Sequence, residues 1–220
     1  MAASLRTVIG IVGYSPVLDC YPLGPCLMEG LRTHLRHQSS VQVENMTWSP
    51  IHIVQRFQDP EMQRPDRLVL VGEAPISRAP GRVTAYRWLG GRLSEFALQE
   101  RIYEAVTGIV DIENTLAIGE HFGVWPTECY AVEADLPPNC FGQMVIAQNE
   151  KRSDDAALIA QFGFSPCLMV EEIAETCCAL ALCGKEARVR LEPKRATALA
   201  TGTTFAQIHV VDESGTHQQD

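Results

Sequence analysis

The chain has 220 residues, of which 46% are hydrophobic and 20% are charged. This predicts one large domain, or one domain with an appendage, that can bury a substantial core. The formal net charge is −9, which argues against nucleic acid or an anionic membrane as the main partner because both bind clustered Lys and Arg. No stretch reaches the roughly 18 apolar residues that span a bilayer, and no signal-peptide pattern precedes the first predicted strand, so we expect a cytoplasmic protein.

The first third of the chain alternates predicted strands with predicted helices. Apolar runs predict strands over 7–12, 41–48 and 67–71, and alternating polar residues in the second run indicate one exposed face. Leucines at helical spacing predict a helix over 23–36. Ser49 and Pro50 are typical of the cap and first turn of a helix that continues to residue 57.

The rest of the chain continues this pattern as far as residue 182. Strands are predicted over 82–88 and 128–133, helices over 94–106 and 111–122, and irregular structure over 137–153. Residues 154–182 are predicted to be helical with an interruption at 163–166, where Ser165 caps and Pro166 opens the final helix. Short strands are predicted over 188–191 and 205–211, as a hairpin at the sheet edge or within a largely disordered tail.

Strands that alternate with helices pair in parallel through right-handed crossovers. The sequence therefore predicts an α/β protein: a three-layer sandwich with a mostly parallel sheet of about five strands and helices on both faces. Residues 1–183 would form this domain, and residues 184–220 a C-terminal extension. Ligands of such sheets bind beyond the carboxyl ends of the strands, which places a site between loops 13–22 and 72–75.

Each of these two loops carries one acidic residue, Asp19 or Glu73. Glu73 follows an apolar strand by a single glycine, and a carboxylate there is costly unless it is paired, capped or ligated. A functional role and a structural one, as a helix cap or an Arg partner, both fit this position. The first loop lacks G-x-G-x-x-G and the P-loop motif, which argues against nucleotide binding.

The chain contains eight cysteines but no C-x-x-C pair, which argues against a structural zinc site of the usual kind. In a reducing cytoplasm we expect free thiols. Four of them occur in an apolar segment and are predicted to be small core residues: Cys167, Cys177, Cys178 and Cys183.

Four collinear segments between residues 6 and 183 resemble one known family. They are TVIGIVGYSPVLDCYPLGP with the helix CLMEGLR, DRLVLVGEAPISRAPGRVTAYRW, ENTLAIGEHFGVWPTECYAVEAD, and FGFSPCLMVEEIAETCCALAL. They are similar to the hydrogenase maturation endopeptidases, which remove the C-terminal extension of the nickel–iron hydrogenase large subunit. The matched features are the glycine-containing first loop, the strand ending in Asp-Ala, the Gly-x-x-Pro before a strand, and the Gly-Leu-Ser/Thr-Pro helix start. The resemblance implies a phosphorylase/hydrolase-like fold.

The resemblance also implies a metal-sized hollow formed by two carboxylates and a His, a ligand set that suits nickel. Nickel would be sensed on the large-subunit precursor, with no tightly bound cofactor. The family's strand-end Asp falls on Glu73. Its acid pair falls on Asp19 and Cys20, or on Cys20 and Tyr21, because the loop is one residue longer.

The family's His falls near Gly108, where this chain has no His. His121 is the nearest in sequence, and Asp111 and Glu113 are closer by position. The resemblance therefore implies the metal-facing set Asp19, Cys20, Glu73 and His121, with Tyr21 and Arg78 as substrate contacts. Cys20 would also serve as a nucleophile if His121 were its base, although this pairing is not evident.

Substrate recognition is expected at the rim, from segments 75–78, 88–91 and 137–149. Arg78, Arg82 and Arg87 would pair with acidic groups of a partner, or simply solvate a strand edge.

Three functions remain open: an active endopeptidase with a rewired site, a non-catalytic relative that binds the hydrogenase precursor, and an unrelated α/β module. Convergence of Asp19, Glu73 and a third ligand within about 5 Å would favour the enzyme. Filling of the hollow by Tyr21 would favour the accessory protein.

Overall fold

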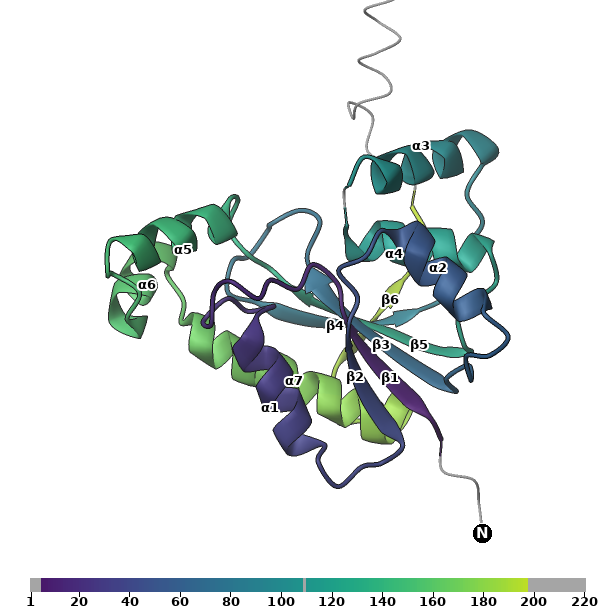
Figure 1. Ribbon diagram of the computed structural model, residues 1–220, viewed down its shortest axis with the longest axis horizontal. Helices are drawn as coiled ribbons and strands as arrows, with labels where there is room; N and C mark the ends of the chain where they lie inside the picture. Colours follow the sequence, from purple (N-terminus) through teal and green to yellow (C-terminus); the bar gives the residue numbers. More distant parts are fainter. Residues whose placement is uncertain (1–4, 109, 198–220) are drawn as a thin grey trace, which may run out of the picture.

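The computed structural model describes residues 5–108 and 110–197, and this part of the chain folds around one six-stranded sheet (Figure 1). The strands are β1 (Thr7–Ile11), β2 (Val41–Asn45), β3 (Arg67–Glu73), β4 (Val83–Trp88), β5 (Glu128–Ala134) and β6 (Leu191–Lys194). The helices are α1 (Pro25–His34), α2 (Pro50–Gln58), α3 (Glu95–Val106), α4 (Ile112–His121), α5 (Cys140–Asn149), α6 (Asp155–Phe162), α7 (Pro166–Cys183) and the short 3-10 helix η1 (Gly184–Glu186).

The strand order in the sheet is β2-β1-β3-β5-β4-β6. The first four of these strands are mutually parallel, β4 is antiparallel to β5, and β6 is parallel to β4. Glu73 at the end of β3 pairs with Ala134 at the end of β5, and Ile11 at the end of β1 pairs with Val71. The three central strands therefore end at one edge of the sheet, which we call the carboxyl edge.

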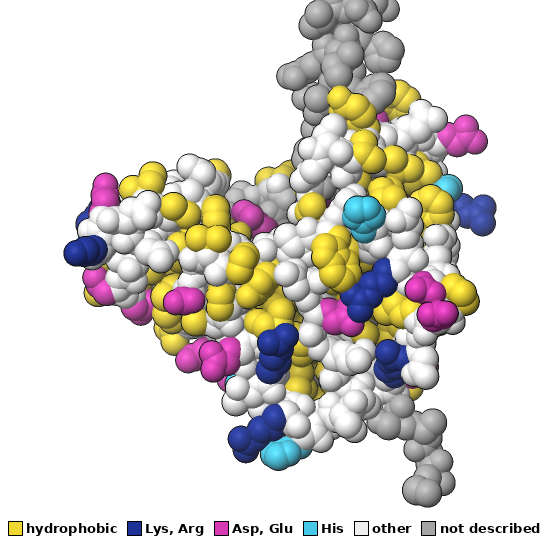
Figure 2. Space-filling view, in the orientation of Figure 1, with side chains coloured by type: hydrophobic (Ala, Val, Ile, Leu, Met, Phe, Trp, Pro, Cys, Tyr) yellow, Lys and Arg dark blue, Asp and Glu magenta, His cyan; other side chains and the backbone are white. Residues whose placement is uncertain are grey.

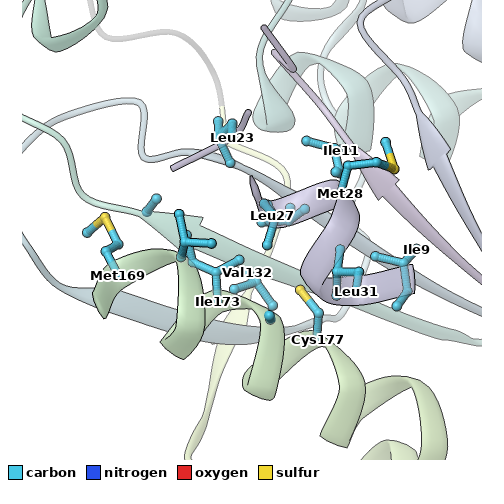
Figure 3. Packing of buried hydrophobic residues seen from close by; sticks show 14 of the residues in the cluster. Ile9, Ile11, Leu23, Leu27, Met28, Leu31, Val132, Met169, Ile173 and Cys177 are labelled. Carbon is cyan, nitrogen blue, oxygen red and sulfur yellow. The ribbon is translucent and has the colours of Figure 1, made fainter. Parts of the chain in front are cut away.

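One face of the sheet packs against α1 and α7 (Figure 1). Figure 3 shows Leu31 of α1 close to Ile9 of β1, with Ile173 and Cys177 of α7 near Val132 of β5. All five side chains are fully buried. Burial of an aliphatic side chain of this size contributes about 1.5–3 kcal/mol relative to exposure, so this layer is a main source of stability.

The other face packs against α2 and α4 through a second apolar cluster that includes Leu70 of β3, Phe57 of α2 and Leu116 of α4, and α3 packs on the outer side of these two helices. Gly72 lets α4 begin close to β3, because a Cβ at this position would lie only 3.2 Å from Cβ of Ile112. Helices thus cover both faces, and the predicted three-layer α/β sandwich with a mostly parallel sheet is confirmed. In Figure 1, α5 and α6 extend beyond the carboxyl edge, next to the start of α7.

The predicted helix starts are confirmed in detail. The hydroxyl of Ser49 accepts a hydrogen bond from the amide of Ile51 (3.4 Å), and that of Ser165 accepts one from Leu168 (3.1 Å). A proline follows each cap as the first helical residue, where its missing N–H costs nothing.

Three predictions about elements need correction. The segment predicted to be irregular contains α5, which buries Cys140, Met144 and Ala147 at helical spacing. β2 ends at Asn45 rather than at residue 48, because the Asn45 side chain accepts a hydrogen bond from the amide of Thr47 (2.9 Å) and turns the chain.

In the extension, β6 begins at Leu191, at the end of the range predicted for this strand. Its Pro193 suits an edge strand, where no ladder hydrogen bond is lost. The strand predicted over 205–211 lies outside the described residues.

The prediction that four C-terminal cysteines are core residues is wrong for two of them. Cys177 and Cys178 are buried, whereas Cys167 and Cys183, at the two ends of α7, are exposed. All eight cysteines are free thiols.

None of the helices in the described residues combines the length and apolar composition needed to cross a membrane.

Candidate functional site

The first loop, between β1 and α1, folds back on itself at the carboxyl edge. The amide of Ser15 donates to the carbonyl of Leu23 (3.1 Å), and the amide of Gly24 donates to the carbonyl of Tyr21 (2.8 Å). A Cβ at Gly24 would lie 2.5 Å from the carbonyl oxygen of Leu18, so only glycine fits this closure. The closed loop turns Tyr21 inward, where it is 5% exposed, and leaves Asp19 exposed.

Tyr21 meets Glu73 at the end of β3. Its phenol is hydrogen-bonded to the Glu73 carboxyl group, and its ring packs edge-on against Phe141 of α5, with centroids 5.4 Å apart. Burial, followed by the Glu73 charge, raises the pKa of Tyr21 well above its usual value, so the phenol stays protonated and donates. The side chain of Tyr21 therefore fills the space between Glu73 and Phe141.

The same arrangement perturbs the neighbouring groups. Burial raises the pKa of Glu73, an effect that the Tyr21 hydrogen bond opposes and the nearby Asp135 charge reinforces. Glu73 nevertheless keeps an exposed side. Burial and the Glu73 charge raise the pKa of Cys140 to about 12, so this thiol remains protonated and is a poor nucleophile.

A polar cavity of about 650 Å³ opens beside this group, between β4, β5 and β6 and the facing parts of α3 and α4. Lys194 of β6 spans it. Its Nζ lies 2.5 Å from Oε1 of Glu133 and 3.0 Å from Oε1 of Glu113, and it passes 4.9 Å from the ring centre of Tyr86. Arg101 of α3 also bonds Glu113 (3.2 Å). The cavity wall is thus built from paired charges.

Burial and ion pairing shift the pKa values of the cavity carboxyl groups in opposite directions. Burial alone would raise the pKa of Glu113, but Lys194 and Arg101 outweigh it and the pKa is lowered. Burial prevails at Glu133, whose pKa is raised despite Lys194. Asp111 caps α4 by accepting from the amide of Asn114 (2.6 Å), and burial raises its pKa.

Asp135 organises the rim of the cavity. Its carboxylate accepts hydrogen bonds from the Ser77 hydroxyl (2.6 Å) and from the amides of Arg78 (2.9 Å) and Ala79 (2.7 Å). Although burial opposes the change, these bonds lower the pKa of Asp135. The backbone of Arg78 is fixed in this way, and its exposed side chain lies at the cavity mouth with that of Arg82.

The structure does not bring the expected metal set together. Glu73 contacts Tyr21, which was predicted as a substrate contact, and Asp19 is exposed. Cys20 precedes Tyr21 in the chain but lies near Cys167 of α7. Across residues 5–108 and 110–197, no three His, Cys, Asp or Glu side chains converge closely enough to hold a metal ion.

His121 lies at the opposite edge of the sheet from Glu73. Helix α4 begins near Gly72, at the carboxyl edge, and runs back along the sheet. Its last residues lie near the end of the antiparallel strand β4, where Trp88 Nε1 donates to Glu120 (2.8 Å). The exposed ring of His121 packs against Phe122 instead. His121 can therefore serve neither as the third ligand beside Glu73 nor as the base for Cys20.

The sequence interpretation missed the charged group formed by Lys194, Glu133 and Arg101. Glu133 could have been recognised from the sequence, because it is an acidic residue within the apolar strand YAVEA. Glu73 is likewise the one acidic residue of the strand RLVLVGE. Nothing in the sequence indicated a role for Lys194, because this residue lies in the segment that was predicted to be a C-terminal extension.

Comparisons of the chain with protein-family models, with curated protein sequences and with solved structures found no match. Function is therefore inferred from the chemistry of the site and from the four segments that resemble the endopeptidases.

Proposed function

We propose that the protein is a non-proteolytic accessory protein that binds the precursor of a nickel–iron hydrogenase large subunit. The observation that carries this proposal is the buried phenol of Tyr21, which is hydrogen-bonded to Glu73, the residue that the resemblance aligns with the family's strand-end Asp. The partner follows from the four resembling segments.

Tyr21 makes metal binding at Glu73 costly. A nickel ion on the side of Glu73 that faces Tyr21 would have to displace the phenol, which would expose a ring that is now 5% accessible. Exposure of an apolar side chain of this size costs about 1.5–3 kcal/mol, and loss of the hydrogen bond adds about 1 kcal/mol. Such a penalty weakens metal binding by roughly two orders of magnitude or more, since 1.4 kcal/mol is a factor of about ten.

The surface around the first loop supports binding. Val17 (63% exposed), Phe141 (38%), Leu168 (64%) and Ile76 (59%) lie on the loops and helix starts beside Tyr21 and Glu73. Figure 2 shows apolar side chains gathered over α5, α6 and the start of α7. Exposed apolar side chains of this size commonly mark protein-binding surfaces, and we call these four residues the apolar rim.

The test is co-purification with a nickel-loaded large-subunit precursor that keeps its C-terminal extension. We expect a stable complex and an unchanged precursor. Replacement of two rim residues, Phe141→Ser with Ile76→Ser, should weaken the complex at least tenfold. Leu5→Ser removes an equally exposed side chain (54%) before β1, far along the sheet, and should leave the complex intact. Failure to bind, or equal loss in both variants, would contradict the proposal.

Active proteolysis is the second candidate, and one observation favours it. Glu73 combines an exposed side with a raised pKa, which are properties of a general acid or base. Under this alternative the precursor would lose its C-terminal peptide, and Glu73→Gln would abolish the cleavage.

A further inference from the structure

The polar cavity between β4, β5, β6 and the facing parts of α3 and α4 has no role in the proposed function. Its volume of about 650 Å³ falls within the range of roughly 300–1,000 Å³ that small-molecule sites occupy. Arg101, Glu104 and Glu133 line it and are themselves buried, whereas Arg78 and Arg82 at its mouth are exposed. The cavity therefore combines a buried, charged inner wall with an entrance that solvent reaches.

The two cations of the inner wall already have partners. Lys194 Nζ lies between Glu133 (2.5 Å) and Glu113 (3.0 Å), and Arg101 also bonds Glu113 (3.2 Å). Arg101 is further held by the side-chain carbonyl of Asn114, which accepts a hydrogen bond from it (2.8 Å). Glu113 and Glu133 thus take up both cations of the inner wall.

Two further carboxyl groups line the inner wall, those of Glu104 in α3 and Asp111 at the start of α4. Both accept hydrogen bonds from Asn114, Glu104 from its side-chain amide (3.0 Å) and Asp111 from its backbone amide (2.6 Å). Among residues 5–108 and 110–197, no Lys or Arg side chain forms an ion pair with either of them. Because a buried carboxylate is costly without a compensating cation, a positively charged ligand would stabilise this pair.

The donor set favours an organic cation over a metal ion. Within the part of the chain that the structure describes, no three His, Cys, Asp or Glu side chains converge closely enough to hold a metal. A protonated amine needs no such convergence, because its three N–H groups donate to separate acceptors. The apolar side chains of Ala74, Pro75 and Ile76 also line the cavity, and they suit the methylene chain of an aliphatic amine.

We propose that the cavity binds a small aliphatic amine, whose ammonium group is held by Glu104 and Asp111. The carbon chain of the ligand lies along Ala74, Pro75 and Ile76, toward the mouth. The inference does not rest on the proposed function, and the experiment that tests it contains no hydrogenase precursor.

Two classes of molecule carry such an amine, and the mouth of the cavity distinguishes them. A diamine presents a second cation at its outer end, whereas an amino acid presents a carboxylate. The amides of Arg78 and Ala79 donate to Asp135 (2.9 and 2.7 Å) and so fix the backbone at the mouth, where the Arg78 side chain is exposed. Because Arg78 attracts a carboxylate and repels a second ammonium group, we expect the amino acid to bind more tightly.

The test is isothermal titration calorimetry of the full chain with three ligands of equal chain length. Cadaverine carries two amines, 5-aminopentanoate carries one amine and one carboxylate, and pentanoate carries the carboxylate alone. About 0.15 M salt screens the general attraction of cations to the negatively charged protein. We expect saturable binding of 5-aminopentanoate with a Kd below about 1 mM, weaker binding of cadaverine, and no binding of pentanoate.

Two substitutions remove the acidic charges while they keep the local hydrogen bonds. Asp111→Asn retains a cap for α4, since Asn and Asp cap helices about equally well, and Glu104→Gln retains an acceptor for Asn114. Each should weaken the binding of 5-aminopentanoate by about tenfold or more, as expected when one partner of a buried charge pair is removed. Asp154→Asn makes the same change at the cap of α6, where Asp154 accepts from the amide of Ala157 (3.0 Å), and should bind as the native chain does.

Three results would overturn the proposal. They are the lack of saturable binding of either amine to the native chain, binding of pentanoate as tight as that of the amines, and equal weakening in Asp154→Asn. Tighter binding of cadaverine than of 5-aminopentanoate would keep the amine site and assign it to a diamine. Arg78→Ala should lower the affinity for 5-aminopentanoate and not that for cadaverine. Because the first two results come from the native sequence, they decide the proposal even if a variant fails to fold.

Discussion

Lys194→Met tests the charged wall of the cavity. Lys194 is 12% exposed, and its two partners, Glu133 and Glu113, are 5% and 22% exposed. Methionine keeps the apolar stem of the lysine over Tyr86 but removes the charge. Glu113 would retain Arg101 as a partner, whereas Glu133 would lose the cation that compensates its burial.

Breaking a buried ion pair by removal of one partner costs about 3–5 kcal/mol. The pKa of Glu133 is already raised by burial, and loss of Lys194 raises it further. A carboxyl group whose folded pKa exceeds its unfolded value stabilises the protein at low pH, and this contribution is lost as the pH rises through the folded pKa. The deficit of Lys194→Met should therefore grow between about pH 5 and pH 7.5.

Urea denaturation followed by circular dichroism measures this effect at both pH values. The double variant Glu133→Gln with Lys194→Met removes both charges and should recover at least half of the lost free energy of unfolding, with a weaker pH dependence. A loss below about 1 kcal/mol in Lys194→Met, equal at both pH values, would refute the reasoning.

Two further predictions concern the first loop. Tyr21→Phe removes the hydrogen bond that lowers the pKa of Glu73, so this pKa should rise further in a carbon-detected NMR titration and stability should fall by about 1 kcal/mol; an unchanged Glu73 titration would exclude the contact. Gly24→Ala places a Cβ against the carbonyl of Leu18 and should lower the free energy of unfolding by more than about 2 kcal/mol. Gly30→Ala adds a Cβ in α1 whose nearest neighbour would lie 3.9 Å away, so this variant should instead gain roughly 0.5–1 kcal/mol of stability. Urea melts in which Gly24→Ala is more stable than Gly30→Ala would contradict the loop geometry.

Most of the fold follows from local patterns in the sequence. The apolar runs that became β1 and β3 and the Ser-Pro starts of α2 and α7 depend on neighbouring residues, so they could be predicted. Helix α5 was missed because Pro137, Pro138 and Gly142 suggest a loop. Its buried positions, four and three residues apart, were the signal that could have found it.

The position of Glu73 at the end of β3 was predicted, but the residues that surround it were not. Glu73 could be assigned to the carboxyl edge because it follows an apolar strand. That Tyr21, rather than Asp19, turns inward depends on the closure of the loop at Gly24. The error over His121 was avoidable, because a helix that precedes a parallel strand begins at the carboxyl edge and carries its last residues away from it.

The ion pairs of Lys194 could not be predicted from the sequence. Lys194 and Glu113 are 81 positions apart in the chain, and Lys194 reaches its partners only because β6 joins the sheet.

The most direct test of the central claim is the intact mass of a nickel-loaded large-subunit precursor after incubation with this protein. If Tyr21 and Glu73 form a closed, non-catalytic site, the precursor should keep its full mass while it elutes with the protein in a complex. Loss of the C-terminal extension in the presence of the native chain, and not of Glu73→Gln, would contradict this assignment.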